Sequence, residues 1–129
     1  MNNEIINYNI NNYSNSVFIK IKEKTKANNY CFNCNIKDPK WVNIENGTFI
    51  CSKCAGKERN LDNNYTILSL IFDQFSQNQI KRLIVGGNQE LIDYLYLNDE
   101  IKENYYFHKC ETLINYRKEL DEKCKKLII

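Results

Sequence analysis

With 129 residues and a formal net charge of +2, the chain fits one domain of ordinary size with a modest hydrophobic core. No apolar run approaches the ~20 residues that a membrane-spanning helix needs, so the sequence predicts no transmembrane segment. The stretch Met1–Asn7 lacks a basic region followed by an apolar one, and it does not resemble a secretory signal. Two cysteines outside any metal-binding pattern, Cys110 and Cys124, are ordinary in a reducing compartment, which favours a cytoplasmic protein.

The N-terminal segment differs in composition from the rest of the chain. Residues 1–16 are dominated by asparagine with scattered isoleucine and tyrosine, which predicts a flexible arm. The remaining residues, 17–129, form the predicted domain, with its core at about residues 17–120. Within residues 17–27 the apolar spacing favours a helix, although the alternation of apolar and basic residues at 19–22 also suits a short strand.

Two Cys-x-x-Cys pairs dominate the next segment, and sixteen residues separate the first pair from the second. Each pair can bind a metal through a tight turn, and the separation is long enough for a hairpin that brings the pairs together. Four thiolates in tetrahedral arrangement are typical of structural zinc and leave no open coordination position for catalysis. Disulfides are the alternative, which the cytoplasmic character of the chain disfavours. The spacing therefore predicts one structural zinc ion bound by Cys31, Cys34, Cys51 and Cys54.

Between the cysteine pairs lies a hairpin signal. Trp41–Ile44 and Thr48–Ile50 are rich in β-forming residues and flank Glu45-Asn46-Gly47. An Asn-Gly dipeptide favours a hairpin because both residue types tolerate positive φ. The hairpin carries the second cysteine pair back to the first.

The segments after Cys54 predict further elements in order. The short polar stretch that contains Arg59 predicts one or two helical turns. The β-branched and aliphatic residues of Thr66–Phe72 predict a core strand. Ser76 and Gln79 form a capping-box pattern, which opens a helix. Its expected buried face consists of Ile80, Leu83 and Ile84.

Two more helices complete the predicted domain. Gly86-Gly87 ends the capped helix, and Asn88 is expected to cap the next, which buries Leu91, Ile92 and Leu95. From Asp99 onward, three- and four-residue steps between apolar residues predict a long amphipathic helix. Its buried face consists of Leu113, Tyr116, Leu120, Cys124 and Leu127. The fold class is therefore α+β, a zinc hairpin with four cysteine ligands and a small central sheet flanked by helices.

The charge distribution bears on the class of partner. Four thiolates around one divalent cation add a net charge of −2, which brings the metallated protein close to neutral. A neutral domain lacks the positive field of most nucleic-acid binders, so we expect no nucleic-acid partner. A nucleic-acid-binding zinc finger of the GATA or ribbon type nevertheless remains an alternative, because it shares the cysteine spacing. The lysines between residues 20 and 26 read as a solvated helix face.

The complete pattern resembles the ArfGAP domain family. That family has Cys-x-x-Cys, sixteen residues, Cys-x-x-Cys, four residues and Arg, which this chain reproduces with Arg59 in the last position. Further matches are Pro39-x-Trp41, Gly47-x-Phe49-x-Cys51 and Gly86-Gly87-Asn88, the last of these closest to the Golgi coatomer-associated subgroup. The resemblance covers roughly residues 17–120.

The resemblance implies a function and a set of partners. ArfGAP domains stimulate GTP hydrolysis on the GTP-bound form of Arf-family small GTPases and so regulate vesicle coat traffic. Arg59 is implied to be the arginine finger, supplied in trans, because a planar, permanently charged guanidinium can neutralise charge on the transferred phosphoryl oxygens. Coatomer or another coat protein is an implied partner, and recruitment to Golgi or vesicle membranes is implied for a monomeric protein.

Three departures from the family pattern surround Arg59. Glu58 replaces the usual His, Asp62 replaces a Gly, and Leu68 replaces a frequent second Arg. The Glu58 carboxylate is expected to compete for the Arg59 guanidinium. These changes leave open an alternative, a catalytically weak or inactive ArfGAP-fold adaptor that binds a GTPase or coat protein. Trp41 is expected to lie in the core and to shape the surroundings of Arg59, and His108 is expected to be structural.

Overall fold

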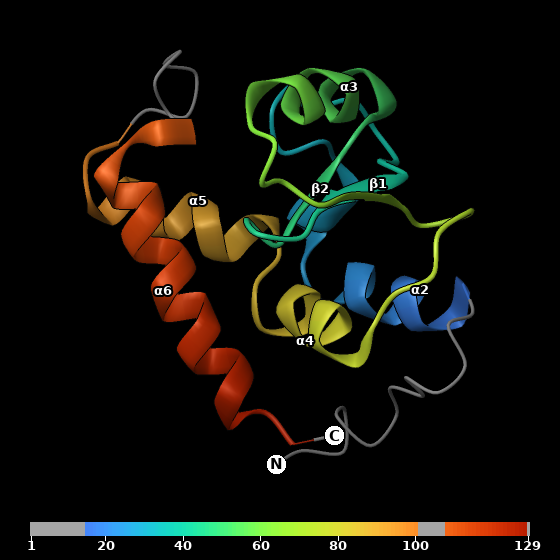
Figure 1. Ribbon diagram of the computed structural model, residues 1–129. Coiled ribbons are helices and arrows are strands. Elements are labelled where there is room, and N and C mark those ends of the chain that lie inside the picture. The colour runs from blue at the N-terminus through green and yellow to red at the C-terminus, as the bar shows by residue number, and fades with distance from the viewer. Residues whose placement is uncertain (1–14, 101–107, 129) are drawn as a thin grey trace.

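The computed structural model describes residues 15–100 and 108–128. In this part of the chain a three-stranded antiparallel sheet lies between helices (Figure 1), which confirms the α+β class. The central strand β1, Trp41–Asn43, pairs with β2, Thr48–Ile50, on one side and with β3, Ile67–Ser69, on the other. The helices are α2 (Asn15–Lys24), the 3-10 helix η1 (Lys26–Asn29), α3 (Ser52–Leu61), α4 (Gln77–Val85), α5 (Asn88–Leu97) and α6 (Glu111–Lys126).

The sheet separates two buried clusters because successive side chains of a strand point to opposite faces. Val42 and Phe49 pack in the cluster that includes the apolar residues of α2 and α4. Ile50 and Ile67 pack in the other cluster, which contains the cysteines and the apolar faces of α5 and α6. Figure 1 shows the same division, with α3 on one side of the sheet and α2 and α4 on the other. The predicted flexible arm, residues 1–16, lies almost entirely outside the described residues.

The predicted hairpin is confirmed, and its connection is a loop at residues 44–47. Of the Asn-Gly dipeptide, only Gly47 adopts positive φ, at 64°. A Cβ at Gly47 would lie 3.1 Å from Leu120 Cδ2 and 3.3 Å from the Arg82 carbonyl oxygen. Asn46 is instead buried, where its amide donates to the Tyr65 hydroxyl at 3.4 Å. Glycine therefore serves this turn both by its backbone freedom and by admitting α4 and α6 close to the loop.

Two predicted boundaries are wrong. The segment predicted at residues 17–27 is helical rather than a strand, but α2 covers Asn15–Lys24 and the separate 3-10 helix η1 follows it. The predicted strand Thr66–Phe72 is shorter, because β3 ends at Ser69 and the chain turns there. The Ser69 hydroxyl accepts hydrogen bonds from the backbone N–H groups of Ile71 and Phe72, both at 3.1 Å. A side-chain acceptor that satisfies two consecutive N–H groups competes with the strand ladder, and the β-forming sequence does not reveal it.

The capping box is confirmed at the start of α4, where Ser76 and Gln79 exchange both hydrogen bonds. The predicted cap of α5 is wrong, because Gly87, at φ 94°, is the N-cap and Asn88 is the first helical residue. The Asn88 side chain instead accepts from the Phe49 N–H at 2.8 Å and donates to the Tyr30 carbonyl at 2.8 Å. It is 1% exposed and joins α5, β2 and the segment that precedes the first cysteine pair.

The lysine run before the cysteines is only partly a solvated face. The Lys22 side chain is 11% exposed, donates to the Pro39 carbonyl at 2.5 Å and pairs with Asp38. Lys24 donates to the Ile84 carbonyl at the end of α4, at 2.8 Å. Lysine stems of this length can cover apolar surface while the ammonium reaches a carbonyl group. Lys22 and Lys24 therefore attach α2 to its neighbours.

The C-terminal helix begins later than the sequence predicts. α6 starts at Glu111, and Leu113, Tyr116 and Leu120 are buried as predicted, whereas Cys124 and Leu127 are half-buried. The Arg82 guanidinium on α4 forms an ion pair with Asp121 of α6 and donates to backbone carbonyls of the hairpin loop. Within residues 15–100 and 108–128, no helix is both long enough and apolar enough to cross a membrane.

The Asn88 contacts predict a large stability effect. Asn88→Ala should lower the free energy of unfolding by about 2–3 kcal/mol, because a buried N–H and buried carbonyls lose their partner. Urea unfolding followed by circular dichroism measures this change. The control is Gln89→Ala, since that exposed amide donates to Asp93 of its own helix, and it should cost well under 1 kcal/mol. Equal losses in the two variants would contradict the role assigned to Asn88.

Candidate metal centre and the adjoining arginine surface

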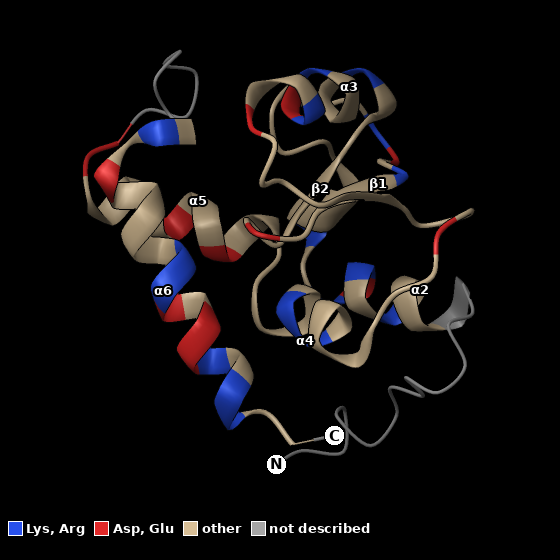
Figure 2. Cartoon of the chain, in the orientation of Figure 1, with Lys and Arg blue, Asp and Glu red and all other residues tan. Residues whose placement is uncertain are grey.

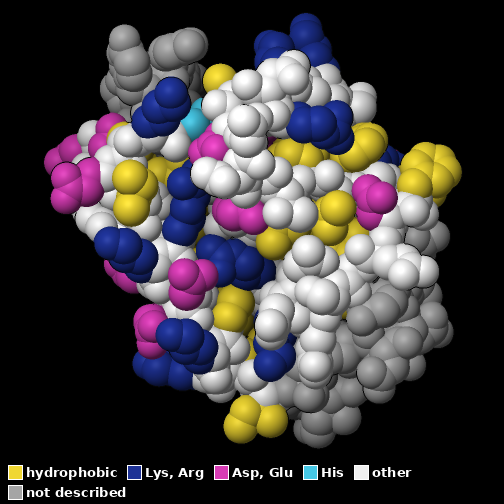
Figure 3. Space-filling view, viewed as in Figure 1, with side chains coloured by type: hydrophobic (Ala, Val, Ile, Leu, Met, Phe, Trp, Pro, Cys, Tyr) yellow, Lys and Arg dark blue, Asp and Glu magenta, His cyan; other side chains and the backbone are white. Residues whose placement is uncertain are grey.

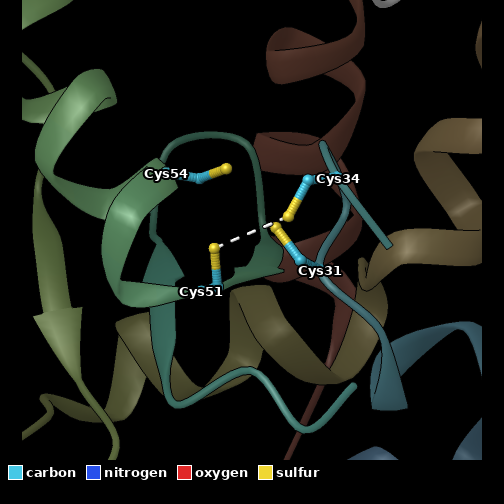
Figure 4. Close-up of side chains that lie close together, drawn as sticks. All are labelled: Cys31, Cys34, Cys51 and Cys54. Atoms are coloured by element: carbon cyan, nitrogen blue, oxygen red, sulfur yellow. Dashed lines mark hydrogen bonds between the residues drawn. The ribbon is translucent and has the colours of Figure 1, made fainter. Parts of the chain in front are cut away.

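The four predicted cysteine ligands come together in the structure (Figure 4). Their Sγ atoms all lie within 4.8 Å of one another, and Cys34 Sγ lies 3.7 Å from Cys51 Sγ. A tetrahedral ion with metal–sulfur bonds of about 2.3 Å places its sulfurs about 3.8 Å apart. The arrangement therefore fits one metal ion, held equally by the two Cys-x-x-Cys pairs. Among the described residues this is the only group of cysteine, histidine or carboxylate side chains with such geometry, and Cys110 and Cys124 lie outside it.

Local backbone structure turns each pair toward the centre. In the first pair, the Cys31 carbonyl accepts from the Asn35 N–H at 2.9 Å, and Asn35 takes positive φ, 65°. In the second pair, Cys51 is the N-cap of α3 and Cys54 lies in its first turn. β2 ends at Ile50, directly before Cys51, so the hairpin delivers the second pair and the start of α3 together.

Burial of the thiols makes their deprotonation depend on a compensating positive charge. Burial raises the pKa of Cys31 and of Cys54, which disfavours their thiolates. Burial has the same tendency at Cys51, but the Cys54 N–H and the neighbouring thiols outweigh it and lower the Cys51 pKa to about 7. A divalent cation compensates buried thiolates, so metal binding and deprotonation are coupled at such a centre.

Arg59 is exposed on α3, five residues beyond Cys54, which is about one and a half helical turns. Its guanidinium carbon is 5.3 Å from the centroid of the Trp41 ring, a cation–π distance. Trp41, on β1, is half-buried and packs against the cluster that contains the cysteines. The structure thus agrees with the expectation that Trp41 shapes the surroundings of Arg59. The guanidinium is held against a rigid ring and remains open to a partner.

The expected competition from Glu58 does not occur, which corrects the sequence-based prediction. Glu58 is 2% exposed and points into the protein, where its carboxylate accepts from the side-chain amides of Asn33 and Asn43. Burial raises the pKa of Glu58, and the two amides and the charge of Arg117 oppose that shift. Neighbours on a helix differ by about 100° in direction, so Glu58 faces inward where Arg59 faces outward. Among the described residues no carboxylate pairs with Arg59.

An exposed apolar tip follows the end of β3, and the sequence gives no indication of it. Ser69 pairs with Trp41 across the sheet, and the Leu70 N–H donates to the Lys40 carbonyl at 2.9 Å. The next two residues, Ile71 and Phe72, are 55% and 83% exposed. Figure 3 shows hydrophobic side chains gathered on this side of the molecule, below the basic residues of α3. The apolar run 66–72 reads as a core strand in the sequence, and only the turn at Ser69 exposes its end.

His108 has structural contacts, as predicted. Its Nδ1 lies 2.7 Å from the Tyr65 hydroxyl, and burial together with the charge of Arg117 lowers the His108 pKa to about 4. Arg117 of α6 donates to the same hydroxyl and to Asn46 Oδ1. This cluster attaches α6 to the hairpin loop on the side away from Trp41. Figure 2 shows that basic and acidic residues alternate along α6, whereas exposed basic residues mark α3.

Comparison with known proteins gives a consistent picture. Residues 15–126 match the ArfGap family model, described as "Putative GTPase activating protein for Arf". The chain is 34% identical over 73 residues to the ADP-ribosylation factor GTPase-activating protein GCS1 of Saccharomyces cerevisiae, a match that covers 56% of this chain and 21% of that protein. It is 38% identical over 63 residues to the ADP-ribosylation factor GTPase-activating protein AGD12 of Arabidopsis thaliana, 47% of this chain and 19% of that protein. The chain thus spans about a fifth of the length of these curated relatives.

Solved structures show the same fold. The crystal structure of a "putative GTPase activating protein for ADP ribosylation factor" from Cryptosporidium parvum superposes with a TM-score of 0.75 at 20% identity, covering 86% of this chain and 94% of that one. The ArfGap domain of HIV-1 Rev binding protein gives a TM-score of 0.52 at 24% identity, covering 88% and 95%. At these identities the likeness establishes the fold alone.

The cysteine geometry predicts one metal ion per chain. Elemental analysis of the purified protein should find close to one equivalent, and Cys51→Ser should lose it, because three thiolates remain and α3 loses its first attachment. Cys124→Ser is the matched control, since Cys124 lies outside the cluster, and it should retain the full equivalent. A metal content that does not differ between the two variants would show that the four cysteines are not the binding site.

Proposed function

The chain belongs to the ArfGAP domain family, and from this premise we propose that it stimulates GTP hydrolysis on an Arf-family small GTPase through Arg59, inserted in trans. The observation that carries the proposal is the exposed Arg59 guanidinium, packed 5.3 Å from the Trp41 ring on a helix that starts at two metal-binding cysteines. Hydrolysis develops negative charge on the transferred phosphoryl group, and an arginine supplied in trans accelerates it by about 10³–10⁵. An arginine held rigidly needs little reorganisation to reach that charge.

We assign zinc to the metal centre, bound by Cys31, Cys34, Cys51 and Cys54. Four soft thiolates in a tetrahedral arrangement suit zinc, and four protein ligands leave no position for substrate. The ion would therefore stabilise the hairpin and the start of α3 and would take no part in the chemistry. The GTPase would supply the nucleotide, the magnesium ion and the attacking water.

The face around Arg59 suits a protein partner. The exposed apolar pair Ile71 and Phe72 follows Ser69, the strand partner of Trp41, and Trp41 lies under Arg59. Exposed Lys53 and Lys57 lie on the same helix as Arg59, about 120° and 160° around its axis from it. Specific interfaces are enriched in exposed aromatic anchors and in arginine, and they have a polar rim. We therefore propose that the GTP-bound GTPase covers this face. The proposed cellular setting is the cytoplasm, with recruitment to Golgi or vesicle membranes through coat proteins such as coatomer.

An adaptor without catalytic activity is the second candidate. Asp62 and Leu68, where the family has Gly and a frequent Arg, favour it, since the chain lacks that second arginine. Leu68 is partly buried and packs with Val42 on the opposite face of the sheet from Trp41. The third departure, Glu58, does not favour it, because its carboxylate points away from Arg59. A nucleic-acid-binding zinc finger loses its main support, because membership of the ArfGAP family accounts for the cysteine spacing.

The arginine assignment predicts a selective loss of rate. Arg59→Lys should lower single-turnover GTP hydrolysis on a responsive Arf at least about 10²-fold at saturating protein, while affinity changes little. Lysine keeps the charge but loses the planar fork that contacts two oxygens together. The reciprocal variant Lys57→Arg, on the same exposed helix, should keep the wild-type rate. Equal stimulation by Arg59→Lys would remove Arg59 from the mechanism, and a wild-type protein that binds without stimulating would establish the adaptor.

The apolar tip predicts the opposite kinetic pattern. Phe72→Ser should raise the concentration for half-maximal stimulation by about 10- to 100-fold, since an anchoring aromatic contributes roughly 1.5–3 kcal/mol of burial. The rate at saturation should change little, because Phe72 does not contact the phosphoryl group. Tyr96→Ser is the control, since Tyr96 is equally exposed, at 81%, but lies on α5. A titration in which both variants match the wild type would place the partner on another face.

A further inference from the structure

Glu58 and Arg59 are adjacent on α3 but differ completely in environment. Arg59 is exposed, whereas Glu58 is among the most buried charged residues of the described chain, at 2% exposure. A buried carboxylate is costly unless hydrogen-bond donors compensate it. The hydrogen-bond partners of Glu58, the residue before the proposed finger, therefore hold its side chain in one place.

The two carboxylate oxygens of Glu58 have separate donors. Oε2 accepts from the Asn33 side-chain amide at 2.5 Å, and Oε1 accepts from the Asn43 side-chain amide at 2.8 Å. Asn33 lies inside the first cysteine turn, between Cys31 and Cys34. Asn43, on β1, is completely buried, and its own Oδ1 accepts from the Asn46 N–H at 3.1 Å.

These contacts give α3 a second attachment. The first is the metal centre, which holds Cys51 and Cys54 at the start of the helix. The second is one turn later, where Glu58 joins α3 to the opposite cysteine turn and to the central strand. A helix fixed at its start alone can still rotate and tilt, whereas a helix fixed at two successive turns cannot. The direction in which Arg59 points depends on that rotation.

We propose that Glu58 is a positioning residue, which fixes the rotation of α3 through Asn33 and Asn43 so that Arg59 lies across Trp41 at the surface. The inference rests on the proposed function for its catalytic consequence, but the placement of Arg59 on Trp41 is a property of the protein alone. It reverses the role that the sequence suggests for Glu58, a competitor for the guanidinium. It also predicts that histidine, the usual family residue, is unsuitable here, because a neutral imidazole offers one acceptor for two donors.

An exchange of donor and acceptor tests the contact. Asn33→Asp places a second carboxylate against Glu58, and the two groups can form a hydrogen bond only by sharing a proton. At a pH well above the pKa of both carboxyl groups, where all variants are compared, the substitution should disrupt the attachment. Glu58→Gln alone should be mild, because the Asn33 amide can turn and present its oxygen. In the double variant Asn33→Asp, Glu58→Gln, the new amide donates to the new carboxylate at position 33 and its oxygen still accepts from Asn43, so both hydrogen bonds return. Asn35→Asp, at an exposed position just after the same cysteine turn, controls for the added charge.

Two measurements follow the position of Arg59. The chain has a single tryptophan, so the emission of Trp41 in the metallated protein reports the guanidinium beside it, with Arg59→Ala as the reference for its removal. Asn33→Asp and Glu58→His should shift the emission toward that of Arg59→Ala, and the double variant should restore the wild-type spectrum. The single-turnover rate at saturating protein should fall at least about tenfold in Asn33→Asp and return to within about threefold in the double variant, with half-maximal concentrations unchanged.

The outcomes separate this inference from the proposed function. Wild-type emission in metallated Asn33→Asp, or a double variant no better than the single one, would overturn the positioning role. If Asn33→Asp fails to retain metal, the double variant decides: recovery of metal and emission supports the contact, and failure to recover overturns it. A wild-type protein that stimulates no Arf would refute the proposed function, and the emission results would still decide whether Glu58 positions Arg59.

Discussion

The convergence of the four cysteines constrains the rest of this structure. The strands are only three residues long, and a sheet of that size buries too little to hold its hairpin in place alone. The two cysteine turns close the hairpin at its open end, and α3 begins at the second of them. The cysteine cluster therefore places the start of α3, and the buried contacts of Glu58 hold its next turn, although much of the helix surface is exposed.

Buried asparagine side chains also hold the fold together. Asn28, Asn43, Asn46 and Asn88 are all buried, and each joins chain segments that are distant in sequence. The Asn28 side chain, for example, accepts from the Asn88 N–H and donates to the Ile21 carbonyl. An amide carries a donor and an acceptor on one short side chain, so it can satisfy two backbone groups where irregular segments meet. Because the strands of this chain are short, few backbone hydrogen bonds join them, and these side-chain contacts supply part of the connection between segments.

Two faces of the molecule serve different purposes. On the α6 side, Arg82 and Arg117 direct their donors to carbonyl groups, a carboxylate and a hydroxyl within the protein. On the α3 side, the Arg59 guanidinium lies over an aromatic ring, and Phe72 contacts little of the protein beside it. Arginines with many internal partners stabilise the fold, whereas an arginine held by its stem and ring contact keeps its donors for a ligand. The distribution of internal contacts distinguishes the arginine suited to a partner from the structural ones.

The sequence by itself determined the metal-binding cysteines, the hairpin between them, the capped helix at Ser76 and the α+β class, because each depends on residues a few positions apart. Spacing, turn chemistry and local periodicity are readable without knowledge of the rest of the fold. Tertiary structure decided the rest. Phe72 leaves the core at a local turn, where its N–H donates to Ser69. In contrast, the direction of Glu58 and the joining of three segments by Asn88 depend on partners 15 to 61 residues away. A side chain's role in these cases is set by which donor or acceptor the fold places beside it, and that pairing has no signature in the local sequence.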